Sequence, residues 1–174
     1  MSDTPEFSRP FDIRGITAQP VQLTANETER VALAKRFGIV SIDWLRAELC
    51  VEADGAIVSA NGTLDAAIVQ SCAVSGEDIR AEVHEDITMR FVPAESLEAG
   101  EEDEEIELDA DDLDDSPYTG TSFDLGEAVA QSLALAIDPF ATGPNAEAVR
   151  ERHGLTDQGP KGALAAALSE LKKD

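Results

Sequence analysis

Residues 62–93 decide the fold, and they read GTLDAAIVQSCAVSGEDIRAEVHEDITMRFVP. Over residues 79–91 apolar and polar side chains alternate, which is the pattern of a strand with one buried side and one side facing solvent. Residues 64–70 are also extended and apolar, and residues 74–77 (VSGE) have the composition of a turn between the two segments. The stretch therefore predicts an antiparallel pair of strands, with Cys72 near the turn.

The same alternation begins earlier in the chain. Residues 42–52 alternate apolar with polar side chains, and residues 53–55 (ADG) supply a turn. An extended run over residues 56–60 follows, and Asn61-Gly62 indicates either a second turn or a bulge. A short strand at residues 19–23 contains a proline, which is tolerated at a sheet edge. Together these segments predict a meander of three or four long antiparallel strands.

A first helix is predicted over residues 27–37. Asn26 and Glu29 have the spacing of a capping box, in which each side chain accepts a hydrogen bond from the other residue's main-chain N–H. Apolar residues recur along one side of this segment, and Gly38 is placed to end it. The sequence thus marks both ends of the helix.

A second helix is predicted from Leu125 to about Ile137. Asp124 and Glu127 repeat the capping pair, and apolar residues recur every four positions after them. Pro139 ends the helix, because the residue before a proline disfavours the helical conformation. We expect one face of this helix to be buried on the sheet.

The C-terminal part is predicted to be less regular. Residues 140–159 are rich in loop-forming residues, with a helical turn or two around residues 146–153, and Pro160 begins a last helix. The predicted fold class is therefore α+β. It is an antiparallel β-meander, either an open sheet or a partly closed barrel, with about three packed helices and a disordered acidic loop.

The acidic loop is predicted over residues 95–120. Within it, residues 95–115 hold thirteen acidic side chains and no basic one, so self-repulsion favours a flexible loop, with residues 106–108 as its one candidate for strand pairing. Residues 1–15 are expected to form a flexible N-terminal arm whose large apolar residues can dock on the domain. Residues 16–174 then form a single domain that contains the acidic loop.

The whole chain is strongly acidic. It has 36 Asp and Glu residues against 13 Lys and Arg residues, for a formal net charge of −23 at pH 7. Such a surface repels phosphate backbones, because nucleic-acid affinity comes largely from cations that displace condensed counterions. A partner that binds this protein through charge should therefore be basic.

The sequence does not predict an enzyme. His84 and His153 are its two histidines, and neither lies near a nucleophile motif or a phosphate-binding glycine loop. Cys50 and Cys72 are too few for a disulfide framework and lack the spacing of a metal site. A calcium loop counted from Asp109 fails, because its sixth position is not glycine and its twelfth is not glutamate. We expect no catalytic residue, no cofactor and no metal.

The expected location is the cytoplasm, without membrane attachment. Residues 1–11 lack the basic start and the apolar run of a secretory signal. No apolar stretch approaches the ~20 residues that are needed to cross a bilayer.

Several segments taken together resemble one protein family. VQSC (69–72) and MRFVP (89–93) end two strands, an acidic stretch follows, and DLGE (124–127) opens a helix that continues to LALAIDP (133–139). This order resembles the YceD family, described as large ribosomal RNA subunit accumulation proteins of bacteria and plastids, over roughly residues 15–174. The positions that match the family motif are Cys72, Arg90, Phe91, Pro93, Asp124, Leu125, Gly126, Glu127 and Pro139.

Two positions depart from the family pattern. Val69 stands where some members have the first cysteine of a Cys-x-x-Cys pair, so a zinc or redox role of that pair is not expected here. Residues 159–162 (GPKG) stand where the family usually has Asn-Pro-Phe, so the last helix lacks an aromatic anchor.

The resemblance implies a role in the synthesis, processing or stability of large-subunit (23S) ribosomal RNA, and it implies no known catalysis. Combined with the charge, it leads to the hypothesis that the protein binds a basic ribosomal protein or assembly factor. The residues expected to contact this partner are Glu101, Glu102, Asp103, Glu104, Glu105, Asp124 and Glu127.

Two alternatives remain open. One is direct RNA binding through a small C-terminal basic patch, which the overall charge disfavours. The patch consists of Arg150, Arg152, Lys161, Lys172 and Lys173. The other alternative is a generic protein-interaction module whose acidic loop maintains solubility. The oligomeric state is left open as well.

Overall fold

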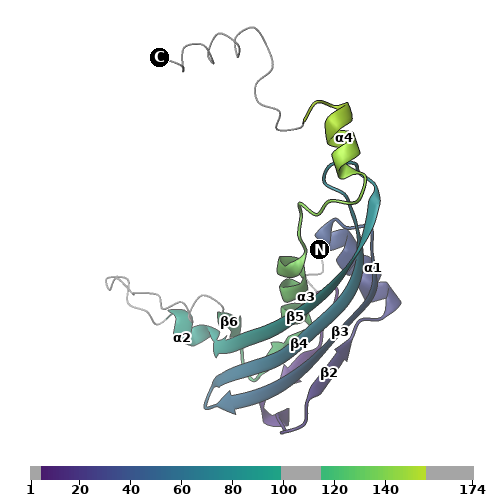
Figure 1. The fold of residues 1–174 in the computed structure, drawn as a ribbon. Coiled ribbons are helices and arrows are strands. Elements are labelled where there is room, and N and C mark those ends of the chain that lie inside the picture. The colour runs from purple at the N-terminus through teal and green to yellow at the C-terminus, as the bar shows by residue number, and fades with distance from the viewer. Residues whose placement is uncertain (1–4, 99–114, 156–174) are drawn as a thin grey trace, which may run out of the picture.

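The predicted hairpin lies at the centre of a computed structural model that describes residues 5–98 and 115–155 (Figure 1). Its two strands are β4 (Ile57–Ser71) and β5 (Asp78–Pro93), which pair antiparallel over fourteen consecutive residue pairs. The turn between them contains Gly76 at φ +71°, a conformation that favours glycine. Both strands are long and curved, so they give the sheet its bowl shape in Figure 1.

The other elements complete an α+β fold. The remaining strands are β1 (Pro10–Asp12), β2 (Val21–Thr24), β3 (Ser41–Asp54), β6 (Asp115–Tyr118) and β7 (Ser122–Asp124). The helices are η1 (Ile13–Gly15), α1 (Glu27–Phe37), α2 (Ala94–Glu98), α3 (Leu125–Ala136) and α4 (Ala146–Arg152). The main sheet has the order β2-β3-β4-β5-β6, and β1 and β7 form a separate two-stranded sheet. Of the two predicted alternatives, the open sheet is therefore confirmed, and it is antiparallel except for the β5–β6 pair.

One predicted break in the sheet is absent. Asn61-Gly62, expected to form a turn or a bulge, lies inside β4, which pairs continuously with both β3 and β5 at this point. A Cβ atom at Gly62 would lie 1.9 Å from the main-chain oxygen of Glu48. Glycine is therefore needed here because β3 approaches closely, not because the chain reverses.

The helix boundaries follow the sequence signals closely. α1 begins at the Asn26–Glu29 capping box and ends at Gly38, which has φ +68°. The predicted second helix is α3, and the expected helical turns around residues 146–153 form α4. At α1 and α3 the side chain of the N-cap residue accepts a main-chain N–H of the first turn, which fixes an end that packing alone would leave free to fray.

A single core joins the sheet to α1 and α3. The inward-facing residues of β3 are buried as the alternation predicts, and Leu45 and Leu49 are fully buried. Leu33 of α1 and Leu133 of α3 belong to the same buried cluster. Both helices therefore cover the same face of the sheet, and the other face, which includes the exposed Cys50, is polar.

The described part of the N-terminal segment is built into the domain. Residues 1–15 were predicted to form a flexible arm, but β1 pairs with β7 and Phe7 is fully buried. Phe11 and Ile13 are partly buried against the same core. The physical reason is that three large apolar side chains so near one another are buried more favourably than they are left in water.

The acidic loop is shorter than predicted at both ends. α2 occupies residues 94–98, and β6 occupies residues 115–118 beside β5. Tyr118 of β6 is buried, and its hydroxyl donates a 2.5 Å hydrogen bond to the main-chain oxygen of Ala56. The candidate pairing segment 106–108 and the helix predicted from Pro160 lie outside the described residues.

Candidate partner-binding groove

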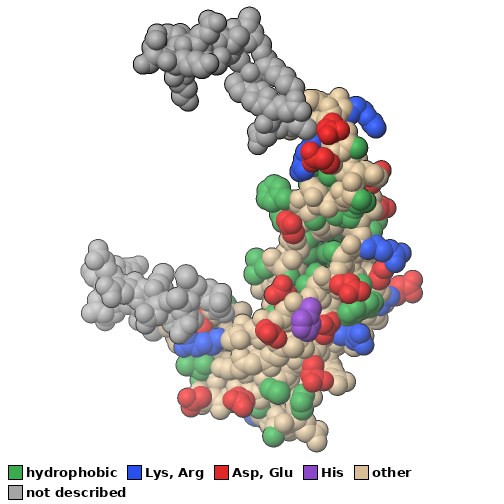
Figure 2. Space-filling view, viewed as in Figure 1, with side chains coloured by type: hydrophobic (Ala, Val, Ile, Leu, Met, Phe, Trp, Pro, Cys, Tyr) green, Lys and Arg blue, Asp and Glu red, His purple; other side chains and the backbone are tan. Residues whose placement is uncertain are grey.

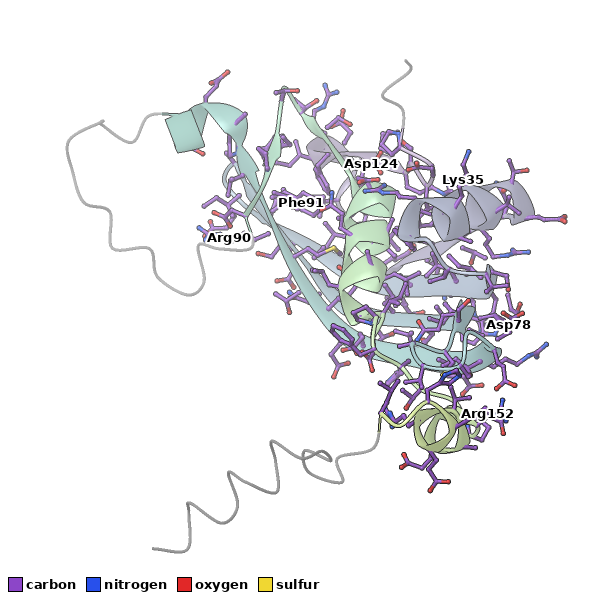
Figure 3. All side chains as sticks on the ribbon, turned by 90° about the horizontal axis from the view of Figure 1, so that it is seen from above. Lys35, Asp78, Arg90, Phe91, Asp124 and Arg152 are labelled. Carbon is purple, nitrogen blue, oxygen red and sulfur yellow. The ribbon has the colours of Figure 1, made fainter. Side chains whose placement is uncertain are left out.

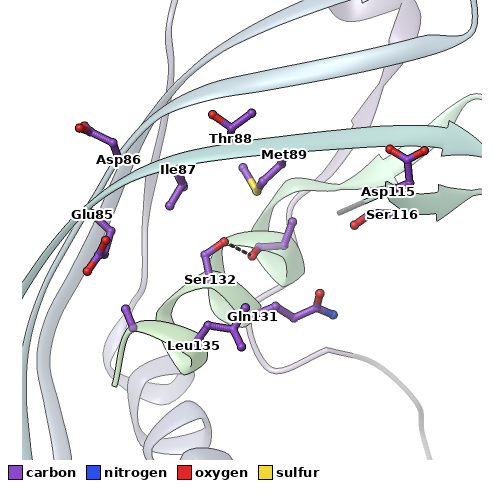
Figure 4. Close-up of a pocket in the computed structure, with 12 residues that line it drawn as sticks. Glu85, Asp86, Ile87, Thr88, Met89, Asp115, Ser116, Gln131, Ser132 and Leu135 are labelled. Atoms are coloured by element: carbon purple, nitrogen blue, oxygen red, sulfur yellow. Dashed lines mark hydrogen bonds between the residues drawn. The ribbon is translucent and has the colours of Figure 1, made fainter. Parts of the chain in front are cut away.

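A groove of about 690 Å³ lies where α3 passes β5 and the start of β6 (Figure 4). We call it the α3–β5 groove. Its lining residues are Glu85, Asp86, Ile87, Thr88, Met89, Asp115, Ser116, Ala128, Gln131, Ser132, Leu135 and Ala136. The groove exists because β6 pairs with β5 only over residues 90–93, and no other described strand pairs with the preceding part of β5 on that side.

The groove combines an apolar floor with acidic sides. In Figure 4, Ile87 and Met89 point from β5 toward α3, whereas Asp86 and Thr88 point to the opposite side of the strand. Among the described residues, its lining includes Glu85, Asp86 and Asp115 and no Lys or Arg, although the Asp86 side chain projects from the outer side of the strand. Charge complementarity therefore favours a cationic occupant.

Glu85 is the acidic residue on the α3 side of the strand. Its position falls in the run of inward-facing residues between Val83 and Ile87, both of which are buried, yet Glu85 itself is exposed. The alternation over residues 79–91 predicts a regular strand and does not by itself single out this residue. The signal was present, because a charged residue at an inward position predicts that the strand is not covered there.

Asp115 closes the groove at the start of β6. Its side chain is only 10% exposed, and Arg90 Nη1 lies 3.3 Å from Oδ1. Among the described residues, Oδ1 is a buried oxygen without a hydrogen-bond partner. Asp115 is therefore a largely buried carboxylate whose charge is partly balanced by Arg90.

Leu135 is the most exposed large apolar residue of the groove. It lies on α3 and is 89% exposed, and Phe140, shortly after the helix, is 79% exposed. In Figure 2, apolar and acidic side chains lie interspersed over the visible face. A cationic partner that also carries apolar side chains would find both kinds of contact here.

Asp124, one of the predicted partner-binding residues, is engaged inside the domain. Its carboxylate accepts hydrogen bonds from Ser8 Oγ at 2.5 Å, from the Arg9 main-chain N at 2.7 Å and from the Glu127 main-chain N at 3.0 Å. It therefore caps α3 as predicted and also fastens the N-terminal segment to this helix. Its position near α3 and α1 is visible in Figure 3.

Glu127, the other described member of the predicted set, binds Arg36 of α1. Both carboxylate oxygens accept from the guanidinium group, at 2.7 and 2.9 Å. The ion pair lowers the pKa of Glu127 and raises that of Arg36. The reciprocal half of the predicted capping pair is absent, because this side chain turns to α1 instead. Residues 101–105, the rest of the predicted set, lie outside the described residues.

Two motif residues are required by close packing. The ring of Phe91 stacks on that of Phe123 with centroids 4.6 Å apart. A Cβ atom at Gly126 would lie 2.4 Å from the main-chain oxygen of Phe7 and 2.8 Å from the main-chain N of Arg9. Glycine at this position lets the N-terminal segment lie directly on α3.

Cys72 holds together the loops at one end of the sheet. Its buried sulfur accepts hydrogen bonds from the main-chain N–H groups of Gly143 and Ser75, each at 3.3 Å, and of Val74 at 3.4 Å. These donors lower the pKa of the thiol to about 6, and the main-chain N–H of Gly143 makes the largest contribution. These contacts give Cys72 a structural role that does not require a second thiol.

The family model for the large ribosomal RNA subunit accumulation protein YceD matches residues 60–163. The chain belongs to the YceD family. Membership implies a role in the accumulation of large-subunit ribosomal RNA. Neither the curated proteins nor the solved structures give a significant match.

The remaining motif positions of this YceD-family protein lie at element ends. Arg90 lies beside Asp115 where β6 joins β5, and Pro93 ends β5. Leu125 is fully buried at the first position of α3, and Pro139 follows the helix. Most motif residues thus support the joints among the sheet, α3 and the N-terminal segment.

Neither histidine of this YceD-family protein lines the groove. His84 is on the outer face of β5, where Nδ1 lies 2.5 Å from Asp65 Oδ1, and this carboxylate raises the pKa of the imidazole. His153 follows α4. Over residues 5–98 and 115–155, no group of three or more His, Cys, Asp and Glu residues could hold a metal ion.

The predicted basic patch is described only in part. Arg150 and Arg152 lie on α4, and Arg150 is 3.4 Å from Glu147 on the same helix. The three lysines of the patch lie outside the described residues.

None of the helices within residues 5–98 and 115–155 has the length and the apolar character that a membrane span requires.

Proposed function

We propose that this protein supports large-subunit ribosomal RNA accumulation without catalysing a reaction, by binding a basic ribosomal protein or assembly factor in the α3–β5 groove. The observation that carries the proposal is a groove whose lining, within residues 5–98 and 115–155, includes three carboxylates and no Lys or Arg. It lies on a chain with a formal net charge of −23. Basic ribosomal proteins need an acidic surface when they are away from RNA, and a groove of this charge offers one.

The pairing of six of the nine arginines with acidic side chains also favours a protein partner over RNA. Arg9, Arg14 and Arg36 are each within 3 Å of an acidic side chain. Arg80, Arg90 and Arg150 each lie within 4 Å of one. Paired cations contribute little to counterion release, because the nearby carboxylates already neutralise them.

The test is affinity capture from cell extract with a charge-reversed groove. The variant Glu85→Lys/Asp86→Lys changes two exposed carboxylates of the groove. We expect recovery of basic large-subunit proteins to fall at least tenfold, because two cations then face the partner. The matched control is Glu52→Lys/Asp54→Lys, which makes the same change in charge at exposed positions at the end of β3 and should keep recovery within twofold.

Treatment of the extract with ribonuclease separates this proposal from direct RNA binding. Recovery of basic proteins that survives ribonuclease and depends on Glu85 and Asp86 supports the proposal. Recovery that is lost on ribonuclease treatment and on changing Arg150 and Arg152 to Gln would instead favour RNA contact through α4.

A further inference from the structure

The free edge of β5 is a second feature of the α3–β5 groove. Along one edge β5 pairs with β4 from Asp78 to Phe91, whereas on the other edge β6 pairs only with residues 90–93. At the far end, the loop that contains Gly143 packs against Ile79. With respect to the described residues, 80–88 thus form an open stretch of strand edge bounded at both ends, roughly 30 Å long at about 3.4 Å per residue.

The register shows which main-chain groups face this edge. In an antiparallel pair, residues that exchange hydrogen bonds with the partner strand alternate with residues whose N–H and C=O point away from it. Cys72 N donates to Glu77 O at 2.7 Å, so counting along the register assigns odd-numbered β5 residues to bonds with β4. The main-chain groups of Arg80, Glu82, His84, Asp86 and Thr88 therefore face the free edge. Among the described residues, no main-chain partner is seen for them there.

Acidic side chains flank this edge on both faces. Glu85 lies on the α3 side, whereas Glu82 and Asp86 lie on the outer side with the other even-numbered residues. Asp115 adds a further carboxylate at one end. Arg80 is the one arginine between Ile79 and Met89, and it lies 3.9 Å from Asp43. A strand added at this edge would thus place its alternate side chains beside carboxylates on both faces.

We propose that β5 binds its basic partner by strand addition, with an extended, lysine- or arginine-rich segment pairing along residues 80–88. This rests on the proposed function and names the partner's conformation and chemistry. Main-chain hydrogen bonds to the edge hold the segment, while the carboxylates select its charge. Leu135, on the α3 side, contacts an apolar residue of the segment.

A second copy of this chain is a poor occupant of the edge. Two β5 edges brought together would oppose Glu82, Glu85 and Asp86 with the same residues of the other copy. Charged residues on an edge strand prevent such self-association. The same charges leave the edge open to a strand of opposite charge.

The test uses a fluorescent nine-residue peptide that alternates lysine and valine, and the full-length protein. Two further versions of the peptide carry N-methyl groups on alternate amides, one on all lysines and the other on all valines. Because only one alternate set of amides faces β5, we expect one version to lose at least tenfold in affinity and the other to stay within twofold of the parent. Equal effects of the two methylation patterns would overturn strand addition.

A variant of the protein tests the same contact from the other side. Thr88→Pro removes one N–H from the free edge but leaves the bonds to β4 in place, and Thr88→Val is the matched control that keeps the N–H. We expect Thr88→Pro to weaken peptide binding at least fivefold relative to Thr88→Val. If Thr88→Pro does not fold, the methylated peptides on the unaltered protein decide the question.

The outcomes separate this inference from the proposed function. If capture of basic proteins depends on Glu85 and Asp86 but both methylated peptides bind equally well, strand addition is overturned and the groove remains the binding site. If the charge reversal does not change capture, the proposed function is overturned, whatever the peptide results. A dimer that Thr88→Pro abolishes would assign the edge to a second copy and also overturn the inference.

Discussion

Two groups of acidic residues lie near α3, and they differ in what surrounds them. At the start of the helix, Asp124 accepts three hydrogen bonds and Glu127 binds Arg36 through both oxygens. Further along, Glu85 and Asp86 line a groove to which the described part of the chain contributes no basic side chain. The first group joins α3 to α1 and to the N-terminal segment, whereas the second faces outward.

The comparison shows that a carboxylate's role depends on the donors that the fold brings to it. A carboxylate with directed donors stabilises the folded chain, because losing it leaves those donors unpaired. A carboxylate without donors contributes little to folding and remains available to a partner. The two carboxylates of the family motif, Asp124 and Glu127, both have such donors. Matching a family motif therefore does not by itself mark a binding surface.

The largest expected effect in this comparison is that of Asp124→Ala. The substitution removes the cap of α3 and leaves the N–H of Arg9 and the hydroxyl of Ser8 without their acceptor. We expect the free energy of unfolding to fall by about 2–3 kcal/mol, combining a lost cap with lost charge-assisted hydrogen bonds. Urea denaturation of Asp124→Ala measures this fall, and Asp86→Ala is the comparison variant. Equal stability of the two variants would contradict the structural role of Asp124.

A smaller, pH-dependent effect is expected at Cys72. Its pKa is lowered to about 6 in the folded protein from an ordinary value near 9, so the thiolate stabilises the fold fully above pH 9 and loses this contribution as the pH falls toward 6. The stability difference between the unaltered protein and Cys72→Ala should therefore be larger at pH 8.5 than at pH 6.

Denaturation at the two pH values measures this difference, with Cys50→Ala as the control because Cys50 is exposed. A difference that does not change with pH would show that the main-chain donors bind a neutral thiol. Absorbance of the thiolate near 240 nm in the Cys50→Ala protein follows the titration directly.

The smallest effect on stability is expected for Glu85→Gln/Asp86→Asn. Both residues are exposed, and removing two like charges from an acidic surface should change the free energy of unfolding by no more than about 0.5 kcal/mol. The same variant should bind the basic peptide more weakly. A loss of stability as large as that of Asp124→Ala would end the distinction between the two acidic groups.

Much of the fold could be predicted because its signals are local. Alternation in β3 and β5 placed the correct residues in the core, and the capping pair at Asn26 with Gly38 gave both ends of α1. The prediction of a turn or bulge at Asn61-Gly62 was wrong, because a glycine that permits close approach of a neighbouring strand looks the same in sequence as one that turns the chain.

The candidate site was only partly accessible to sequence reasoning. The charge predicted a basic partner, but the groove depends on where β6 stops pairing with β5, which no local pattern records. Glu85 was not predicted as a site residue, because one charged residue at an inward position is easily disregarded in a strand that otherwise alternates regularly. Residues 101–105 were favoured by composition, and they lie outside the described residues.

The sequence by itself determined the meander of β3, β4 and β5, the ends of α1 and α3 and the sign of the surface charge, since these follow from neighbours in the chain and from composition. Only the tertiary structure decided which carboxylates are occupied. Arg36 and Glu127 are 91 residues apart in sequence, and Ser8 and Asp124 are 116 apart. Contacts over such separations depend on how whole elements pack, so the engaged and the open acidic residues become distinguishable only after the chain has folded.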